Sequence, residues 1–317
     1  MAVVVIGEAL IDVTDRDESA DDEARLARPG GSPYNVAIGL ARLGQDTAFA
    51  GRISRDPLGV VLRRHAERSG VDLDLVVAAA EATTVALVEL DAAGVARYRF
   101  GVEGTADFAW TDTELAVIPD STPAVHFGSL ASWLPPAADR VHRRVAELRA
   151  AGAAVSYDPN VRPHLQPDAS AARARVEADV ALAHLVKVSD EDLAWLYPRA
   201  DPVEVATEWL LLGPAAVVVT RGGDGPIGVT ATGRVARPAP AVEVVDTVGA
   251  GDAFMSGLLD GLLRRGRLTP SGLDGIDPAT DLAAVLGDAA LVAAITCSRA
   301  GANPPRRAEV DSWDGPR

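Results

Sequence analysis

The chain has 317 residues and a formal net charge of −15, which argues against binding to nucleic acids or to anionic membrane surfaces. Apolar residues make up 48% of it, enough for a large core. No uninterrupted apolar run reaches the roughly 18 residues that a membrane span needs, and no basic segment precedes the first apolar run, so we expect no signal peptide.

Two residue counts narrow the chemistry further. Cys297 is the single cysteine, which excludes an intramolecular disulfide and a cysteine-based metal cluster and favours a cytoplasmic location. Lys187 is the single lysine among 30 basic residues. A Walker A loop requires a Gly-Lys-Ser/Thr tripeptide, which the chain does not contain, so any phosphate chemistry has to use another device.

The first third of the chain alternates between apolar runs and turn residues. We expect a buried strand at Val3–Gly7, followed by an acidic, aperiodic stretch at residues 13–28 that forms an exposed loop or edge. Pro29-Gly30-Gly31 then opens an amphipathic helix that ends at Gly44. Residues 84–90 and 95–100 alternate with period two around Asp91–Gly94, which predicts a β-hairpin.

From residue 124 onward strands and helices alternate. The expected strands are residues 124–127, 153–157, 185–188 and 215–219, and the expected helices are residues 137–151, 169–183, 202–212, 253–265 and 282–295. This order favours a doubly wound, mostly parallel α/β sheet flanked by helices, with residues 1–317 as a single domain. We also expect a polar hairpin around Gly233 and a surface loop at residues 266–280.

Residues 246–254 read Asp-Thr-Val-Gly-Ala-Gly-Asp-Ala-Phe and carry the strongest chemical signal. The preceding apolar run, Val242–Val245, is typical of a strand, and from Phe254 onward apolar residues recur at helical spacing. A helix is therefore expected to begin near Gly251. Backbone N–H groups at such a turn lack partners and lie at the positive end of the helix dipole, an arrangement that binds anions.

Asp252 places a carboxylate at this anion site, where bound phosphate would repel it. The position makes sense for a base that takes a proton from a hydroxyl attacking phosphorus. The alternative is an ordinary helix start, in which Asp252 serves only the helix dipole and the glycines only turn the chain.

Polar residues also follow the expected strands. In open α/β sheets ligands bind beyond the carboxyl ends of the strands. Here those ends carry Asp12, Gly128-Ser129, Asp158-Pro159-Asn160, Ser189–Asp192, Thr220–Gly223 and Asp246-Thr247. Each group alone can be explained as a turn or a helix N-cap. Six in succession, with a glycine anion turn among them, predict a binding edge.

Two motifs far apart in the chain resemble the ribokinase/PfkB family of sugar kinases: Gly30-Gly31 followed by Asn35, and Asp246 to Asp252. The similarity extends over essentially the whole chain. Gly7–Asp12 and Asp158–Arg162 resemble the fructokinase branch in particular. The resemblance implies a ribokinase-like fold with a small β lid formed by about residues 13–28 and 84–104.

The resemblance also implies roles for individual residues. Asp252 would be the catalytic base, and Gly249, Ala250 and Gly251 would donate backbone N–H groups to the transferring phosphoryl group. The residues expected to hold the sugar are Asp12, Gly30, Gly31, Asn35, Tyr98, Phe100 and Arg162. Those expected to bind the nucleotide are Asp158, Asn160, Ser189, Thr220, Gly222 and Gly225. Taken alone, Asn35 could be an N-cap, and the two aromatic residues could be lid packing.

The cofactors implied are ATP, Mg²⁺ and a monovalent cation such as K⁺. Asp192 is the candidate for the magnesium shell, although many relatives carry Asn-x-x-Glu where this chain has Ser189–Asp192. Asp246, the Val248 carbonyl and Asn303 are the expected ligands of the monovalent cation. The oligomeric state stays open, with a homodimer as one alternative.

We therefore expect an ATP-dependent kinase that phosphorylates a primary hydroxyl of a sugar, with D-fructose first. Relatives that act on acid sugars place an arginine in the lid where this chain has Val102-Glu103, which disfavours 2-keto-3-deoxygluconate. The alternatives are a 2-keto-3-deoxygluconate kinase or a ribokinase of the same family, or a non-catalytic sugar sensor on this fold. A nicotinamide-dependent dehydrogenase fails on spacing, because Gly7–Asp12 lacks Gly-x-Gly-x-x-Gly.

Overall fold

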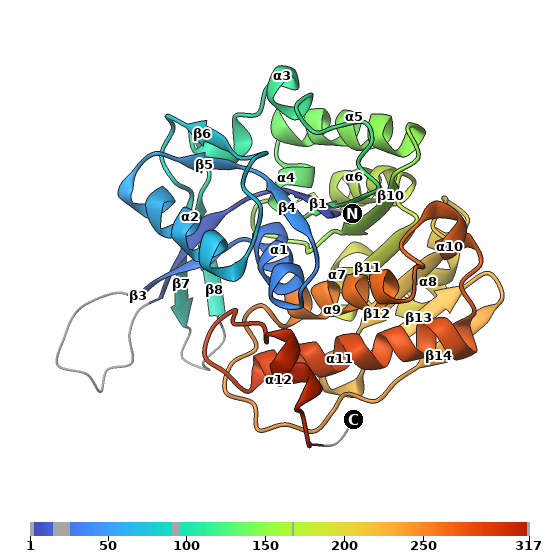
Figure 1. Cartoon of the computed structure of the whole chain (residues 1–317). Coiled ribbons are helices and arrows are strands. Elements are labelled where there is room, and N and C mark those ends of the chain that lie inside the picture. The colour runs from blue at the N-terminus through green and yellow to red at the C-terminus, as the bar shows by residue number, and fades with distance from the viewer. Residues whose placement is uncertain (1–2, 15–25, 91–95, 167, 316–317) are drawn as a thin grey trace.

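The computed structural model describes residues 3–14, 26–90, 96–166 and 168–315. Its centre is an eight-stranded sheet with the strand order β14-β13-β12-β11-β10-β9-β1-β4 (Figure 1). The strands are β1 (Val3–Ile6), β4 (Thr47–Ala50), β9 (Ala124–Gly128), β10 (Ala154–Asp158), β11 (Leu185–Ser189), β12 (Ala216–Thr220), β13 (Ile227–Thr230) and β14 (Gly233–Ala236).

The strands from β4 to β12 are parallel, and β13 and β14 add an antiparallel hairpin at one edge. The parallel strands read as continuous apolar runs because both of their faces are buried. In β1, Val3 and Val5 pack into the core beneath one helical layer, whereas Val4 and Ile6 pack into the core beneath the other. The predicted doubly wound, mostly parallel sheet is confirmed.

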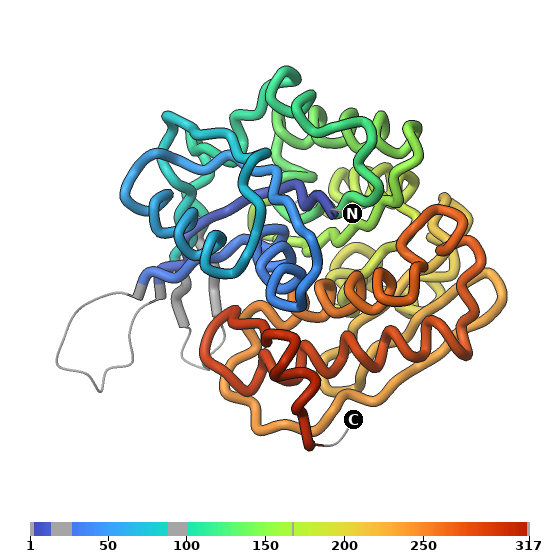
Figure 2. The backbone as a smooth tube through the Cα atoms, in the orientation of Figure 1, coloured from blue at the N-terminus to red at the C-terminus, as the bar shows by residue number. Residues whose placement is uncertain are grey.

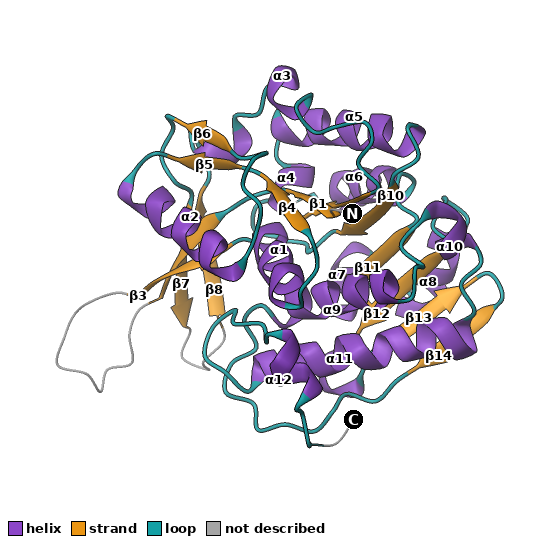
Figure 3. Ribbon diagram, viewed as in Figure 1, coloured by secondary structure: helices purple, strands orange, loops and turns teal. Residues whose placement is uncertain are grey.

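Helices cover both faces of this sheet (Figure 3). One layer consists of α1 (Ser32–Arg42), α2 (Pro57–Ser69), α9 (Ala250–Arg264) and α11 (Ala283–Cys297). The other consists of α4 (Leu130–Trp133), α5 (Ala137–Ala150), α6 (Ala169–Val180), α7 (Asp190–Leu196) and α8 (Pro202–Leu210). The shorter elements are η1 (Ala106–Phe108), α3 (Asp112–Leu115), η2 (Gly222–Asp224), α10 (Pro270–Asp274), η3 (Pro278–Leu282) and α12 (Arg307–Asp311).

A second, four-stranded sheet lies beside the first. Its order is β3-β2-β7-β8, formed by β2 (Leu10–Thr14), β3 (Leu26–Gly30), β7 (Val85–Leu90) and β8 (Ala96–Gly101). The predicted hairpin is confirmed, because β7 and β8 pair antiparallel from Val85–Gly101 onward. Residues 15–25 and 91–95 lie outside the described residues. A small parallel pair, β5 (Arg52–Ser54) and β6 (Val77–Ala79), completes the strands of the described residues.

The contact between helices α1 and α9 joins the N-terminal and C-terminal parts of the chain. In Figure 2 the blue-to-green part of the tube and the yellow-to-red part occupy different sides of the molecule. Helix α1, from the first part, packs against α9, from the second. This contact positions the functional site, because the loops that begin both helices meet there.

Two predictions, one of a strand and one of a surface loop, are wrong. The run Val242–Val245 is not a strand: Val244 and Val245 are each 61% exposed, and the N–H of Val245 donates to the Cys297 carbonyl instead of a ladder. Pro238 and Pro240 just before it also lack the N–H that a ladder needs. Residues 266–280 are not wholly a surface loop, because they contain α10 and bury Leu268, Leu273 and Ile276.

Residues 278–297 form a helical stretch of 20 residues that is apolar and long enough to cross a membrane by composition alone. In its most apolar window 61% is buried within the molecule. Helix α11, which makes up most of this stretch, packs against α9. Core packing therefore accounts for its composition.

The contact between α9 and α11 is close enough to exclude a side chain at Gly257. A Cβ there would lie 2.8 Å from Ala289 Cα and 3.1 Å from Val292 Cβ. We predict that Gly257→Ala lowers the free energy of unfolding by about 1–3 kcal/mol through overpacking. Gly287→Ala, on α11, is the matched control, because a Cβ there meets no atom within 4 Å. It should be neutral or stabilising by about 0.5–1 kcal/mol. Equal effects in urea unfolding would contradict this packing.

Candidate active site

Helix α9 begins at Ala250, one residue before the predicted Gly251, and Gly249 is its N-cap. Gly249 has φ of 75°, a left-handed conformation that favours glycine. The Ala250 N–H donates to the Thr247 carbonyl at 3.2 Å, and the Ala253 N–H donates to the Gly249 carbonyl at 2.8 Å. Within the described residues, the N–H groups of Gly251 and Asp252 bond to no backbone carbonyl. They lie at the positive end of the α9 dipole and can donate hydrogen bonds to an anion.

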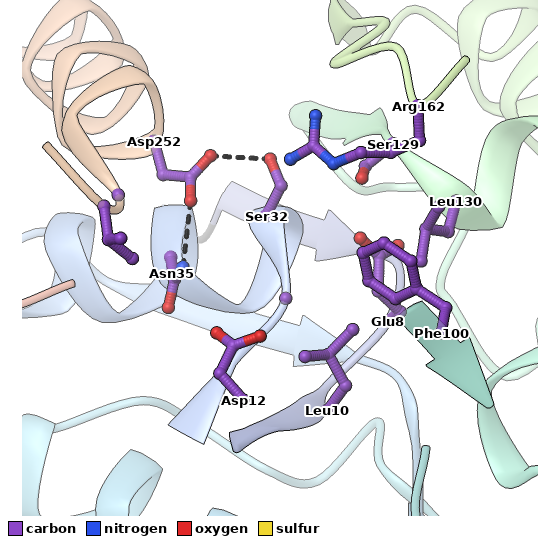
Figure 4. Close-up of a pocket in the computed structure, with 13 residues that line it drawn as sticks. Glu8, Leu10, Asp12, Ser32, Asn35, Phe100, Ser129, Leu130, Arg162 and Asp252 are labelled. Atoms are coloured by element: carbon purple, nitrogen blue, oxygen red, sulfur yellow. Dashed lines mark hydrogen bonds between the residues drawn. The ribbon is translucent and has the colours of Figure 1, made fainter. Parts of the chain in front are cut away.

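The Asp252 carboxylate is held by the start of α1 (Figure 4). Ser32 Oγ donates to Asp252 Oδ1 at 2.7 Å, and Asn35 Nδ2 donates to Asp252 Oδ2 at 2.9 Å. Burial raises the pKa of Asp252, whereas the hydrogen bonds from Asn35 and Ser32 and the charge of Lys187 oppose that rise. The carboxylate is thus oriented at the anion turn, with a basicity above that of an ordinary aspartate.

Asp252 faces a small polar cavity that we call the carboxylate pocket. It is lined by Glu8, Leu10, Asp12, Gly31, Ser32, Asn35, Phe100, Ser129, Leu130, Arg162, Val248, Gly249 and Asp252. Burial raises the pKa of Glu8 to about 7. Burial, with the charge of Asp252, also raises the pKa of Asp12 to about 7, and Arg162 opposes both shifts. The pocket therefore offers several carboxyl groups and one guanidinium to a ligand rich in hydroxyl groups.

The glycine pair at the start of α1 makes room for this pocket. A Cβ at Gly30 would lie 2.1 Å from Asp12 Oδ2, and one at Gly31 would lie 2.6 Å from the Glu8 carbonyl oxygen. Gly31 lines the pocket, whereas Gly30 does not line it and instead leaves space for the Asp12 carboxylate.

The second sheet contributes Phe100 to the pocket. Its ring stacks on His164, with centroids 5.5 Å apart and planes 9° apart. The side chain of Tyr98 lies outside the described part of the structure, although its backbone belongs to β8. Phe100, one of the two aromatic residues predicted to contact the sugar, lines the pocket.

A larger cavity, the apolar cleft, lies on the other side of the glycine turn. Its volume is about 710 Å³, within the range of small-molecule sites. It is lined by Glu191, Thr220, Arg221, Gly222, Gly223, Pro226, Ala239, Pro240, Ala241, Val242, Val244, Thr247, Ala250, Gly251, Phe254, Ala290, Ala293, Ala294 and Cys297. Val242 and Val244, which were predicted to belong to a strand, thus form part of the apolar wall of this cleft.

The two cavities meet at the start of α9. Gly249 and Asp252 line the carboxylate pocket, whereas Ala250 and Gly251 line the apolar cleft. A ligand in each cavity would therefore have one end at the same anion-binding turn. This arrangement suits the transfer of an anionic group from one ligand to the other.

The residues predicted to bind the nucleotide lie partly in the apolar cleft and partly at the ends of β10 and β11. Thr220 and Gly222 line the apolar cleft, whereas Gly225 does not line it. Asp158 is 1% exposed and accepts from Lys187 and from the Asn160 N–H. Ser189 caps α7 by accepting from the Asp192 N–H. These side chains are thus held by the protein itself at the ends of β10 and β11.

Asp192, the predicted magnesium residue, accepts from the Val161 N–H at 3.0 Å. Burial, with the charge of Asp158, raises its pKa to about 6. Within the described residues, no group of three or more His, Cys, Asp or Glu side chains is arranged to hold a metal ion.

The residues predicted to bind a monovalent cation lie in two joined loops. Asp246 accepts from the Val248 N–H at 3.0 Å and from the Gly301 N–H at 2.7 Å. Asn303 instead accepts from the Arg42 guanidinium at 2.6 Å. Asp246 therefore ties the loop before α9 to the loop after α11.

The prediction of six strand ends on one sheet is wrong for two of them. Asp12 lies within β2 of the second sheet, and Asp246 lies in a loop. Residues to which the sequence analysis gave no role also line the pocket: Glu8, Leu10, Ser32 and Leu130. The sequence could have indicated Ser32, which follows the assigned Gly31, and Glu8, which follows the expected strand end at Gly7. Leu10 and Leu130 had none, since apolar residues there read as core.

Three comparisons bear on this geometry. The model of the pfkB family of carbohydrate kinases matches residues 2–309. A fructokinase of Rhizobium leguminosarum bv. trifolii is 36% identical over 275 residues, covering 87% of this chain and 84% of that protein. The structure of fructokinase with bound ATP from Xylella fastidiosa has a TM-score of 0.89 at 30% identity, covering 98% of this chain and 97% of that one.

A third relative is the structure of a fructokinase double mutant from Vibrio cholerae O395 bound to fructose, ADP and a potassium ion. Its TM-score is 0.84 at 26% identity, and the match covers 98% of this chain and 97% of that one. The family model and the curated relative both extend over most of the sequence, and the two structures share the whole fold. The chain belongs to the pfkB family of carbohydrate kinases.

Proposed function

We propose that this kinase transfers the γ-phosphoryl group of ATP to a primary hydroxyl of D-fructose. The observation that carries the proposal is the meeting of the carboxylate pocket and the apolar cleft at one helix N-terminus. The carboxylate pocket takes the sugar, and the apolar cleft takes the nucleotide. The names of the relatives, fructokinases among them, support the choice of sugar.

Asp252 acts as the base in this proposal. Its carboxylate is fixed by Ser32 and Asn35 at the turn where the phosphoryl group would bind. It accepts the proton of the sugar hydroxyl as the oxygen–phosphorus bond forms, while the bond to the ADP leaving group breaks. The N–H groups of Gly251 and Asp252 stabilise the charge of the transferring group.

The lid, the magnesium site and the location complete the proposal. The sheet of β2, β3, β7 and β8 covers the sugar and excludes water, with Phe100 as its contact. Magnesium would neutralise phosphate charge, and the carboxylate of Asp192 would be the residue that holds it. We propose a cytoplasmic location, which the single cysteine supports.

The sugar preference follows from the charges of the carboxylate pocket. Asp12, Glu8 and Asn35 suit a neutral polyol, and Val102 packs among apolar residues where acid-sugar relatives carry an arginine. We predict that kcat/KM falls in the order fructose, ribose, 2-keto-3-deoxygluconate. A coupled assay for ADP with this panel and tagatose measures it. Preference for the acid sugar would contradict the proposal and would indicate Arg162 as the carboxylate partner. If none of the sugars in the panel supports ADP formation, the result would favour a non-catalytic sugar sensor.

Asp252→Asn tests the base directly, because it keeps the shape and removes the proton acceptor. We expect kcat to fall by about 10²–10⁴-fold. Burial raises the folded-state pKa of Asp252, so its ionisation lowers the free energy of unfolding progressively as the pH rises from the usual aspartate pKa through the folded-state pKa. Asn removes the buried charge but also leaves Ser32 or Asn35 without its acceptor, and these effects oppose each other, so the melting temperature should stay close to that of the wild type. An ordinary helix start predicts the reverse, with a lower melting temperature and a kcat within a few-fold of wild type.

A monovalent cation is the other cofactor that we propose. Asp246 already joins the two loops through Val248 and Gly301, and a cation beside it would reinforce the positive field of the turn. The Vibrio cholerae relative with its potassium ion supports the idea. We predict that adding potassium to a buffer free of potassium and sodium raises kcat. Tetramethylammonium at equal ionic strength is the control, and an equal response to both ions would refute a specific site.

A further inference from the structure

The only lysine of the chain is buried beneath the glycine turn. Lys187 lies on β11, between the apolar residues Val186 and Val188, and is 4% exposed. Its ammonium donates to Asp158 Oδ2 at 2.8 Å. A Cβ on Gly251 would lie 3.0 Å from Lys187 Nζ. The absence of a side chain on the second glycine of the turn therefore leaves room for this ammonium, and a larger residue there would press on it.

Several carboxylates surround the ammonium. Burial opposes its charge most strongly, but Asp158, together with Asp252 and Asp192, outweighs burial and raises the pKa of Lys187. Lys187 therefore stays charged. Burial and this charge lower the pKa of His126 to about 3, so that histidine is neutral. Among the groups that act on Asp252, Lys187 supplies a positive charge and Asp158 a negative one.

A buried ion pair is a poor way to stabilise a strand. The desolvation of two charges often costs more than their attraction returns, so a well-packed apolar pair would serve the fold as well or better. The neighbouring positions on β11 are apolar and fully buried. The position of the ammonium at the anion turn provides a reason for the charge that packing does not.

We propose that Lys187 is a positioning residue for phosphoryl transfer: Asp158 holds its ammonium behind Gly251, where it adds a fixed positive charge to the turn that receives the γ-phosphoryl group. The inference rests on the proposed function, because it assigns the turn to that group. The charge acts through the glycine turn and on Asp252. It favours ligands that place a terminal phosphoryl group at the turn over ligands that do not.

The test compares Lys187→Met with Arg52→Met in the full-length protein. Arg52 is a cation of similar burial, 5% exposed, which pairs with Glu81 and Glu114 away from the turn. Calorimetry with ADP and with the non-hydrolysable ATP analogue AMP-PNP, both with magnesium and without sugar, gives the first readout. Lys187→Met should lose AMP-PNP affinity by at least about 10-fold and keep ADP affinity within threefold, whereas Arg52→Met should keep the wild-type ratio.

Steady-state kinetics with the preferred sugar gives the second readout. Lys187→Met should lower kcat by about 10²–10³-fold, as for loss of one oxyanion-hole donor, with the KM for the sugar within threefold. An unchanged AMP-PNP to ADP ratio with kcat within fivefold of wild type would overturn the inference. If fructose is not the sugar, the proposed substrate fails, but the sugar-free calorimetry still decides the role of Lys187.

A double variant removes the effect of an unpaired charge on folding. Lys187→Met leaves Asp158 buried without its partner, whereas Lys187→Met with Asp158→Asn leaves a neutral pair that should fold. We expect the double variant to remain deficient in AMP-PNP preference. Recovery of the wild-type ratio by the neutral pair would show that the lysine serves only the fold, and would overturn the inference.

Discussion

The hydrogen bonds from Ser32 and Asn35 to the Asp252 carboxylate join the first helix after the glycine pair to the helix that begins at the anion turn. These residues are more than 200 positions apart in the sequence. The contact of α1 with α9 fixes both helix starts relative to each other, and with them the two cavities. If this contact shifted, the base and the anion turn would no longer face one ligand.

Charge balance is the second constraint on the site. Glu8, Asp12 and Asp252 gather in one small cavity, and burial raises the pKa of each. Arg162 and Lys187 compensate them from two directions, Arg162 within the pocket and Lys187 behind the turn. Neither cation lies on the helix that carries the base. The site therefore depends on the parallel sheet, which brings the ends of β10 and β11 under α9.

Local pattern predicted the parallel sheet and the start of α9, because each depends on residues close in sequence. Pocket residues such as Asn35 and Arg162 were instead assigned from the family resemblance, since local pattern does not show which distant residues meet. It failed at Val242–Val245, since an apolar run reads as a strand whether it faces a core or a ligand cleft. Asp12 lines the carboxylate pocket but lies on the second sheet and not at the end of a strand of the first, because strand pairing is a long-range property. The sequence analysis noted Lys187 as the single lysine but gave it no role, since the sequence of a strand does not show which residues pack against its end.

The central claim is that sugar and nucleotide meet at the turn before Asp252. A crystal structure of the protein with D-fructose, ADP and aluminium fluoride tests it most directly. The account predicts fructose in the carboxylate pocket, with a primary hydroxyl about 2.6–3.2 Å from the Asp252 carboxylate. ADP should fill the apolar cleft, with the aluminium fluoride against the N–H groups of Gly251 and Asp252. A sugar bound elsewhere, or an aluminium fluoride away from that turn, would contradict the account.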